Sequence, residues 1–99
     1  MKSNETEKPI EDYLVESVER LGGLCLKLCL IGLRGWPDRT LVFYRAIYFV
    51  ETKRPKGGRL SAQQKFWRRV LARLGWEVET ICTKKQVDEF LLRVCSGTY

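Results

Sequence analysis

Two apolar stretches joined by only two residues dominate the middle of this chain. They run from Thr40 to Tyr44 and from Ile47 to Lys53, and both are rich in β-branched and aromatic residues. Stretches of this composition form strands, and a connection as short as Arg45-Ala46 predicts a β-hairpin. Both faces of the hairpin are apolar, and strands of that kind are usually covered by helices on both sides.

Three charged side chains gather at the open end of the predicted hairpin. With pairing symmetric about the two-residue turn, Asp38 opposes Lys53 and Thr40 opposes Glu51. Because side chains alternate along a strand, Asp38, Glu51 and Lys53 should project from one face. Carboxylates in such a place are costly to bury unless a cation or mutual neutralisation offsets their charge. The arrangement suits a divalent cation beside a phosphodiester, which makes phosphate-ester cleavage the leading hypothesis; the alternative is that the charged groups are solvated where the strand leaves the core.

Hydrophobic periodicity and turn signals predict the elements outside the hairpin. These are a helix over residues 9–21, a strand over 24–30, a helix after Ser61 that ends at Gly75, a strand over 76–82, and a helix capped by Thr83. The order α-β-β-β-α-β-α, without repeats or linkers, predicts one three-layer α/β domain over residues 1–99, with a mixed sheet flanked by helices. A core of this size would gain from association into a dimer.

Positive charge is concentrated in one part of the chain. Residues 1–19 hold two lysines and six acids, a net −4, so the net +6 of the whole sequence leaves +10 for residues 20–99. The segment from Lys53 to Arg73 contains eight basic residues and no acid. Such a segment suits a polyanionic partner such as a nucleic acid backbone; a solvated helix face is the alternative.

Composition excludes several classes of site. The chain has no histidine and its four cysteines form no C-x-x-C pair, so neither a structural zinc site nor a Ser-His-Asp or Cys-His mechanism is expected. Hard oxygen ligands remain, and they select Mg²⁺ or Mn²⁺. No segment approaches about eighteen uninterrupted apolar residues, and the amino terminus lacks the apolar stretch of a signal peptide. We therefore expect a soluble, cytoplasmic protein without a membrane partner.

Short motifs along nearly the whole chain resemble one nuclease family. In order they are Ile10-Glu11-Asp12-Tyr13-Leu14, Gly22-Gly23, Gly35-Trp36-Pro37-Asp38-Arg39, Phe49-Val50-Glu51-Thr52-Lys53-Arg54-Pro55 and Gly58-Arg59-Leu60-Ser61-Ala62-Gln63-Gln64. The Pro-Asp and Glu-x-Lys pieces look like the PD-(D/E)xK nuclease superfamily, and the fuller pattern resembles its VRR-NUC branch. The resemblance implies a restriction-endonuclease-like core and an Mg²⁺- or Mn²⁺-dependent nuclease. Stand-alone members of this kind are phage or bacterial proteins thought to act as homodimers on branched DNA such as four-way (Holliday) junctions, which for a phage protein places it in the cytoplasm of the bacterial host.

The resemblance also implies a set of metal ligands. Asp38 and Glu51 match the acidic ligands, and Thr52 stands at the variable position whose backbone carbonyl can join them. Glu11 matches the acidic residue of the first motif. The same helix carries other acids, Asp12 and Glu16, so the choice of Glu11 rests on the Ile10-Glu11 match alone.

Two further residues match catalytic positions of the family. Lys53 matches the active-site lysine, which could orient or deprotonate the attacking water and offset charge on the phosphate. Gln64 matches the glutamine of the following helix. Ser61 and Gln64 also have the spacing of a capping box, in which the amide simply closes the start of the helix.

The basic segment predicts where the phosphate backbone of DNA is contacted. The candidate contacts are Lys56, Arg59, Lys65, Arg68 and Arg69. Contacts to phosphate position DNA without reading its sequence, so a preference for DNA structure is more plausible than sequence specificity. The alternatives are a non-catalytic basic DNA-binding module and an interaction domain whose charge is incidental.

Overall fold

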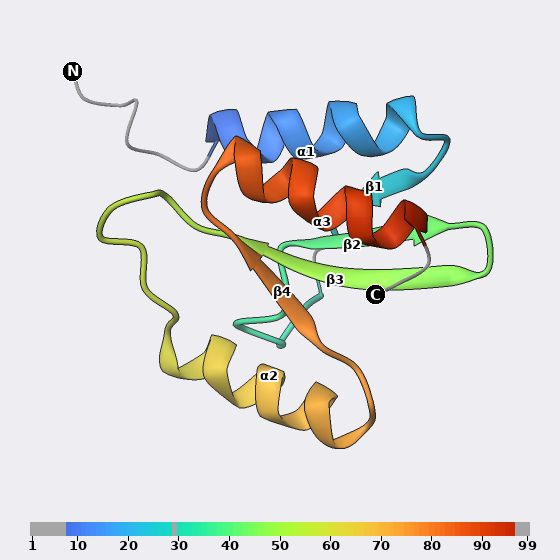
Figure 1. The fold of residues 1–99 in the computed structure, drawn as a ribbon. Coiled ribbons are helices and arrows are strands. Elements are labelled where there is room, and N and C mark those ends of the chain that lie inside the picture. Colours follow the sequence, from blue (N-terminus) through green and yellow to red (C-terminus); the bar gives the residue numbers. More distant parts are fainter. Residues whose placement is uncertain (1–7, 29, 97–99) are drawn as a thin grey trace.

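A mixed four-stranded sheet forms the middle layer of the fold (Figure 1). In the computed structural model, which describes residues 8–28 and 30–96, the elements are α1 (Lys8–Arg20), β1 (Leu24–Leu26), β2 (Arg39–Phe43), β3 (Ala46–Thr52), α2 (Ala62–Arg73), β4 (Val78–Ile81) and α3 (Lys84–Ser96). The strands lie in the order β1-β2-β3-β4, and only the β3–β4 pair is parallel. The predicted element order and three-layer α/β class are confirmed.

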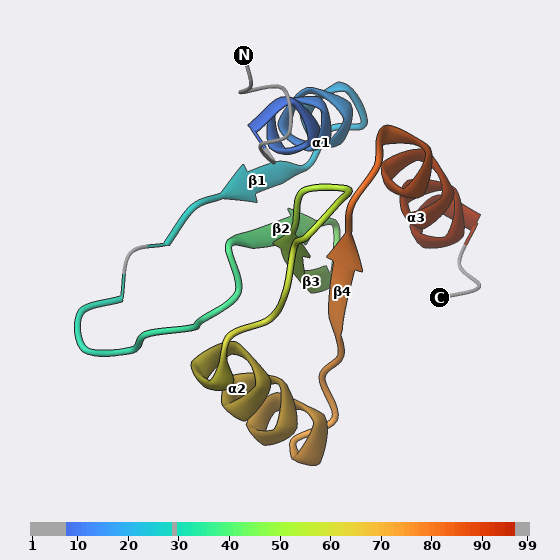
Figure 2. The ribbon, with the colours of Figure 1, turned by 90° about the vertical axis from the view of Figure 1, so that its left-hand side faces the viewer.

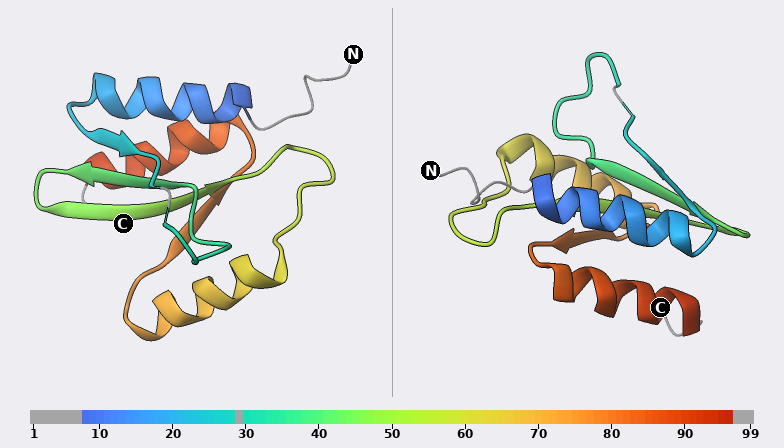
Figure 3. Two further views of the ribbon diagram at one scale, coloured as in Figure 1. Left: turned by 180° about the vertical axis from the view of Figure 1, so that it is seen from behind. Right: turned by 90° about the horizontal axis from the view of Figure 1, so that it is seen from above.

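Helices cover the two faces of the sheet unequally. Figure 2 shows α1 and α3 on one face and α2 alone on the other. Viewed from behind, the segment 30–38 that leads into β2 also lies on the α2 side (Figure 3). No helix within the described ranges is both long and apolar enough to cross a membrane.

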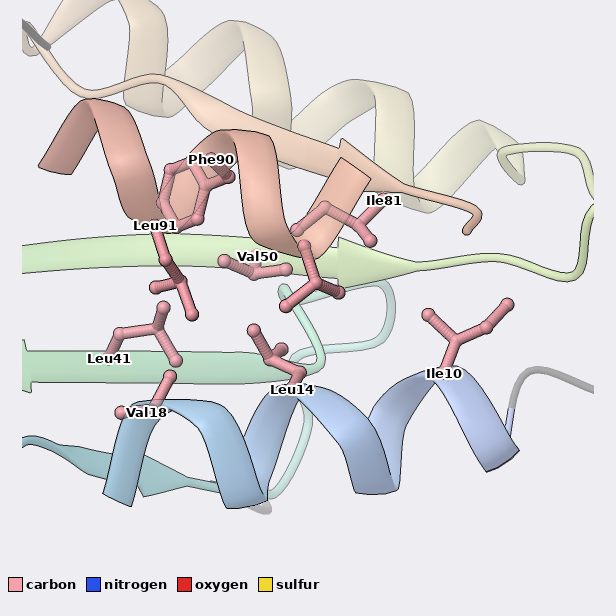
Figure 4. Close-up of a cluster of buried hydrophobic side chains, with 9 residues drawn as sticks. Ile10, Leu14, Val18, Leu41, Val50, Ile81, Phe90 and Leu91 are labelled. Atoms are coloured by element: carbon pink, nitrogen blue, oxygen red, sulfur yellow. The ribbon is translucent and has the colours of Figure 1, made fainter. Parts of the chain in front are cut away.

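The main core lies between the sheet and the pair α1 and α3 (Figure 4). Leu14 and Val18 of α1 and Phe90 of α3 are fully buried there, together with Leu41 of β2 and Val50 of β3. The i, i+4 spacing along α1 and the alternation along the strands place these side chains on facing surfaces, as the periodicity predicted. Their burial anchors the ends of β2 and β3, where the polar residues gather.

Aromatic side chains fill the other side of the sheet. Trp36 packs edge-on against Phe49 at 5.9 Å between ring centroids and against Trp67 of α2 at 5.4 Å. The indole nitrogen of Trp67 donates to the carbonyl of Arg34 at 2.9 Å. Gly35 has a φ of +86° and lies so close to α2 that an added Cβ would be 2.5 Å from the Gln63 carbonyl carbon. These contacts fasten the segment that carries Asp38 onto the first turn of α2.

The register predicted for the hairpin is wrong by two residues. In the structure Phe43 pairs with Ala46, and Tyr44-Arg45 form the turn in place of Arg45-Ala46. Arg45 adopts a left-handed backbone with φ of 61°, a conformation that tight hairpin turns require. Arginine has no preference for this conformation, so nothing in the sequence signalled the position of the turn. A shift of two residues preserves which face each side chain occupies, so it brings Asp38 level with Glu51 instead of Lys53.

The strand predicted over residues 24–30 is also shorter than expected. Only Leu24–Leu26 pair with β2, and the ladder stops at the partner Thr40. In the same register Lys27 would next pair with Arg39 and Leu28 with Asp38, but no ladder forms there, and Cys29 lies outside the described residues. The remaining leucines therefore enter the connecting segment and stay exposed.

Candidate metal centre and active site

Two carboxylates meet at the end of β2 and β3 on the face that α2 covers. Asp38 immediately precedes β2, and Glu51 is the second-last residue of β3. The last ladder pair is Arg39 with Val50, so Asp38 and Glu51 follow as the next opposed positions. The expectation that they share a face is met, because opposed residues of an antiparallel pair project to the same side.

The backbone and hydroxyl of Thr52 hold the Asp38 carboxylate. Oδ2 of Asp38 accepts from the Thr52 amide at 3.1 Å and from its hydroxyl at 3.3 Å. In a strand the N–H and C=O of one residue point toward the same neighbouring strand. The carbonyl of Thr52 therefore faces the Asp38 side, while the next amide, that of Lys53, turns away and donates to Ile81 of β4 at 2.9 Å. This alternation offers the Thr52 oxygen beside the two carboxylates.

Gln64 both caps α2 and contacts Glu51. Its Oε1 accepts from the Ser61 amide at 2.8 Å while the Ser61 hydroxyl accepts from the Gln64 amide at 3.1 Å, which completes the capping box. Its Nε2 donates to Oε2 of Glu51 at 2.5 Å. The two interpretations of Gln64 are thus not exclusive: the cap directs the carbonyl oxygen of the amide to the helix start, so the NH₂ group faces the carboxylate.

Glu51 is buried and resists ionisation. Only 2% of its surface is exposed. Burial raises the pKa of its carboxyl from 4.5 to about 8, and the adjacent Asp38 adds to the rise by its charge and by a shared hydrogen bond. Lys53 and Arg68 lower the pKa of Glu51 without cancelling the rise. If both Asp38 and Glu51 are ionised, the site holds an excess of negative charge, which a cation would relieve.

Lys53 stands beside the pair, and the basic loop folds back on it. The lysine is half-buried and close enough for its charge to favour ionised Glu51. An added Cβ on Gly58 would lie 3.1 Å from the Cβ of Lys53 and 2.8 Å from the carbonyl of Arg54. The loop between β3 and α2 thus makes a tight turn against Lys53.

The residues predicted to contact DNA differ in their exposure to solvent and in the hydrogen bonds they already make. Lys56, Arg59, Lys65 and Arg69 are exposed. Arg68 is not: its guanidinium donates to the carbonyl of Val78 at 3.0 Å and to the hydroxyl of Thr80, both on β4. All five contacts to DNA remain predictions. The hydrogen bonds of Arg68 also join α2 to β4, the strand that pairs with β3.

Glu11 is held by arginine on the opposite side of the sheet. Its Oε2 accepts from Nε of Arg39 at 2.7 Å, and Lys27 approaches the same oxygen at 3.9 Å. Arg39 follows Asp38 directly, so the two side chains point to opposite faces. The role of Glu11 as a metal ligand stays a prediction, and it requires the carboxylate to leave Arg39.

The oxygen donors at this centre suit a small hard cation. Within residues 8–28 and 30–96, no group of three or more carboxylate, cysteine or histidine side chains is arranged as a metal cluster. Asp38, Glu51 and the Thr52 carbonyl are the donors brought together. Magnesium commonly binds through one or two carboxylates and completes its shell with water and substrate phosphate, so this set fits Mg²⁺ or Mn²⁺ without a third side chain.

Sequence reasoning missed Arg39 and the second task of Arg68. Strand alternation could have placed Arg39 opposite the acidic helix, because it is adjacent to Asp38. For Arg68, the i, i+4 spacing from Gln64 indicates that both face the sheet. The spacing could not predict that the guanidinium of Arg68 lies within hydrogen-bonding distance of β4.

A solved structure resembles this fold closely. No family model matches the sequence, and no curated protein matches it either. The similar structure is described as "VRR_NUC domain". It has 30% sequence identity to this chain and a TM-score of 0.79, and the alignment covers 86% of this chain and 92% of the other.

Proposed function

Because this chain belongs to the VRR-NUC family, we propose that it is a metal-dependent DNA endonuclease that hydrolyses phosphodiester bonds. The observation that carries the proposal is the pair of half-buried Asp38 and almost fully buried Glu51, which faces α2 beside the amine of Lys53. A buried carboxylate whose pKa is raised to about 8 is costly to keep ionised in a structural role. Perturbed groups of this kind cluster where chemistry is done.

Each side chain at the centre has a task that its contacts support. Asp38 and Glu51, with the carbonyl of Thr52, would hold Mg²⁺ or Mn²⁺. Such a cation, when bound, lowers the pKa of an attacking water and offsets negative charge on the phosphate. Lys53 places a positive charge next to the carboxylates, where it can orient a water or stabilise the phosphate oxygens. Gln64 keeps the Glu51 carboxylate in one orientation through its capped amide.

The exposed basic residues would position the DNA backbone. Lys65 and Arg69 are four residues apart on α2, hence on one side of the helix, and each directly follows a residue that faces the sheet. Lys56 and Arg59 lie on the loop that folds against Lys53. Contacts of this kind bind phosphate in any sequence, which supports selection by DNA shape. We propose branched DNA, including four-way junctions, as the preferred substrate and a homodimer as the acting form.

A cleavage assay with a matched lysine control tests the proposal. Wild-type protein, Lys53→Ala and Lys85→Ala would be incubated with four-way-junction and linear duplex DNA, in Mg²⁺, in Mn²⁺ and in EDTA. Lys85 is exposed on α3, away from the carboxylates. We expect cleavage by wild type and Lys85→Ala in either metal, none in EDTA, and a loss of about 10²–10⁴-fold in Lys53→Ala.

The same experiment separates the competing functions. If wild type cuts neither substrate but binds both in EDTA, and Asp38→Ala binds equally well, the protein is a basic DNA-binding module. Equal cleavage by Lys53→Ala and Lys85→Ala would remove the lysine from the mechanism. Equal rates on junction and linear DNA would leave the nuclease in place and reject the structural preference.

A further inference from the structure

The connection between β1 and β2 presents apolar side chains to solvent. Leu30 is 39% exposed, Ile31 is 101% exposed and Leu33 is 37% exposed. Figure 2 shows this connection extending well beyond the sheet, and the view from above in Figure 3 agrees. Loops as long as residues 27–38, with no helix or strand of their own, are uncommon in compact domains and usually serve a function. We call Leu30, Ile31 and Leu33 the apolar tip.

A tight turn places Ile31 at the corner of the apolar tip. The amide of Leu33 donates to the carbonyl of Leu30 at 3.2 Å, which closes the turn. Gly32, at the third position, has a φ of +81°, as a type II turn requires. Directly after the turn the backbone is anchored, because the carbonyl of Arg34 accepts from the indole of α2 described above. The tip is therefore held out from a fixed base.

An exposed aromatic ring lies on α2 close to that base. Phe66 is 47% exposed, and its ring packs edge-on against Trp67 at 5.0 Å between centroids. Gly35 lies against Gln63, which is three residues before Phe66 and hence its neighbour on the helix surface. Phe66 and the base of the loop are thus on the same side of α2.

The charges around the apolar tip and Phe66 suit a nucleic acid. Residues 20–37 contain no acid, and Arg34 next to the tip is exposed. On α2 the exposed Lys65 and Arg69 stand before and after Phe66. Cations beside apolar or aromatic groups are the arrangement that holds phosphates while bases stack on the protein. A second copy of the chain would instead bring like charges together.

We propose that Ile31 and Phe66 engage the bases at the branch point of the DNA. Ile31 acts as a wedge against the base pair that ends a duplex arm, and Phe66 is a stacking surface for an unstacked base. Apolar side chains inserted between base steps unstack them, and stacking on an aromatic ring requires no particular sequence. The proposal rests on the proposed function for its substrate class and deepens it: phosphate contacts occur on any duplex, whereas these two residues favour branched over linear DNA.

The position of the wedge also limits where the cut falls. Ile31 precedes Asp38 by seven residues, so the reach of the chain keeps the two at most about 25 Å apart. One DNA strand advances about 3.4 Å per nucleotide. The cut should therefore lie within about seven nucleotides of the branch point.

The fluorescence of 2-aminopurine at the branch point of a four-way junction, measured in EDTA, tests the proposal. The probe brightens when it unstacks, so wild type should raise its fluorescence. Ile31→Ser and Phe66→Ala should lose most of this rise and bind the junction about tenfold more weakly, the scale of one stacking contact, with unchanged binding to linear duplex. The control Leu92→Ser, whose leucine is 72% exposed on α3 across the sheet, should match wild type. Circular dichroism checks the fold, and should Ile31→Ser not fold, Phe66→Ala decides.

The alternatives give distinct results. A wild type that binds the junction without raising the fluorescence overturns the proposal, as does a wild type that binds no DNA. A variant that matches Leu92→Ser removes the residue it replaces, and equal losses on junction and linear DNA show a general phosphate contact in place of a wedge. If Ile31→Ser weakens only the association of copies in sedimentation, the tip is a protein contact and the proposal is wrong. A fluorescence rise without cleavage in Mg²⁺ or Mn²⁺ keeps the proposal and removes the proposed function; cleavage without the rise does the reverse.

Discussion

Replacing Glu51 by glutamine should stabilise the metal-free protein at neutral and alkaline pH while it abolishes cleavage. Glutamine has nearly the same shape as glutamate and cannot ionise. Its oxygen can still accept from Nε2 of Gln64, and its NH₂ can donate to Asp38, so the contacts of the site survive. The change removes the charge and little else.

The size of the effect follows from the pKa of Glu51. It rises from 4.5 to about 8 in the folded protein. Each pKa unit corresponds to about 1.4 kcal/mol, so the ionised side chain costs on the order of 4–5 kcal/mol. The folded-state pKa of Glu51 lies above its unfolded value. Glu51 therefore takes nothing from the free energy of unfolding of wild type below about pH 4.5, lowers it increasingly as pH rises toward about 8, and lowers it by a constant amount above that. A loss of this size is a large part of the roughly 5–15 kcal/mol that holds a typical domain folded.

Urea unfolding in EDTA across this pH range is the assay. The free energies of unfolding of wild type and Glu51→Gln should agree near the acid end and diverge as pH rises, with the glutamine variant more stable. Glu89→Gln, at an exposed position on α3, controls for loss of a surface charge and should track wild type. Added Mg²⁺ or Mn²⁺ should stabilise wild type more at pH about 8 than at about 5, and Glu51→Gln little at either. A constant difference between wild type and Glu51→Gln at every pH would refute the reasoning.

Two other substitutions separate tasks that the structure combines. Ser61→Ala should lower the free energy of unfolding by about 1 kcal/mol through loss of the cap. Gln64→Ala should do the same and also reduce cleavage by about 10–100-fold, because Glu51 loses its donor; equal cleavage by the two variants would make Gln64 a cap only. Glu11→Gln should cost about 2–3 kcal/mol in urea unfolding, since it leaves the Arg39 guanidinium without its carboxylate. If its stability is unchanged while calorimetry shows weaker Mn²⁺ binding, Glu11 acts as a metal ligand and not as the partner of Arg39.

Local spacing in the sequence determined the elements and the faces on which side chains lie. A period of two along the hairpin was enough to place Asp38 and Glu51 on one side, and an error of two residues in register did not disturb it. The Ser61-x-x-Gln64 spacing likewise indicated the helix cap. These features depend on neighbours in the chain, whose geometry hardly varies between folds.

Only the tertiary structure decided the register, the partners and the burial. The left-handed conformation of Arg45 set which residues oppose each other, and β1 ended at Leu26, well short of the predicted strand. Whether Glu11 meets Arg39 or the carboxylate pair, and whether Glu51 keeps its charge, depends on the distance between elements far apart in sequence. Packing of α1, α2 and the sheet sets that distance, and no local pattern encodes it.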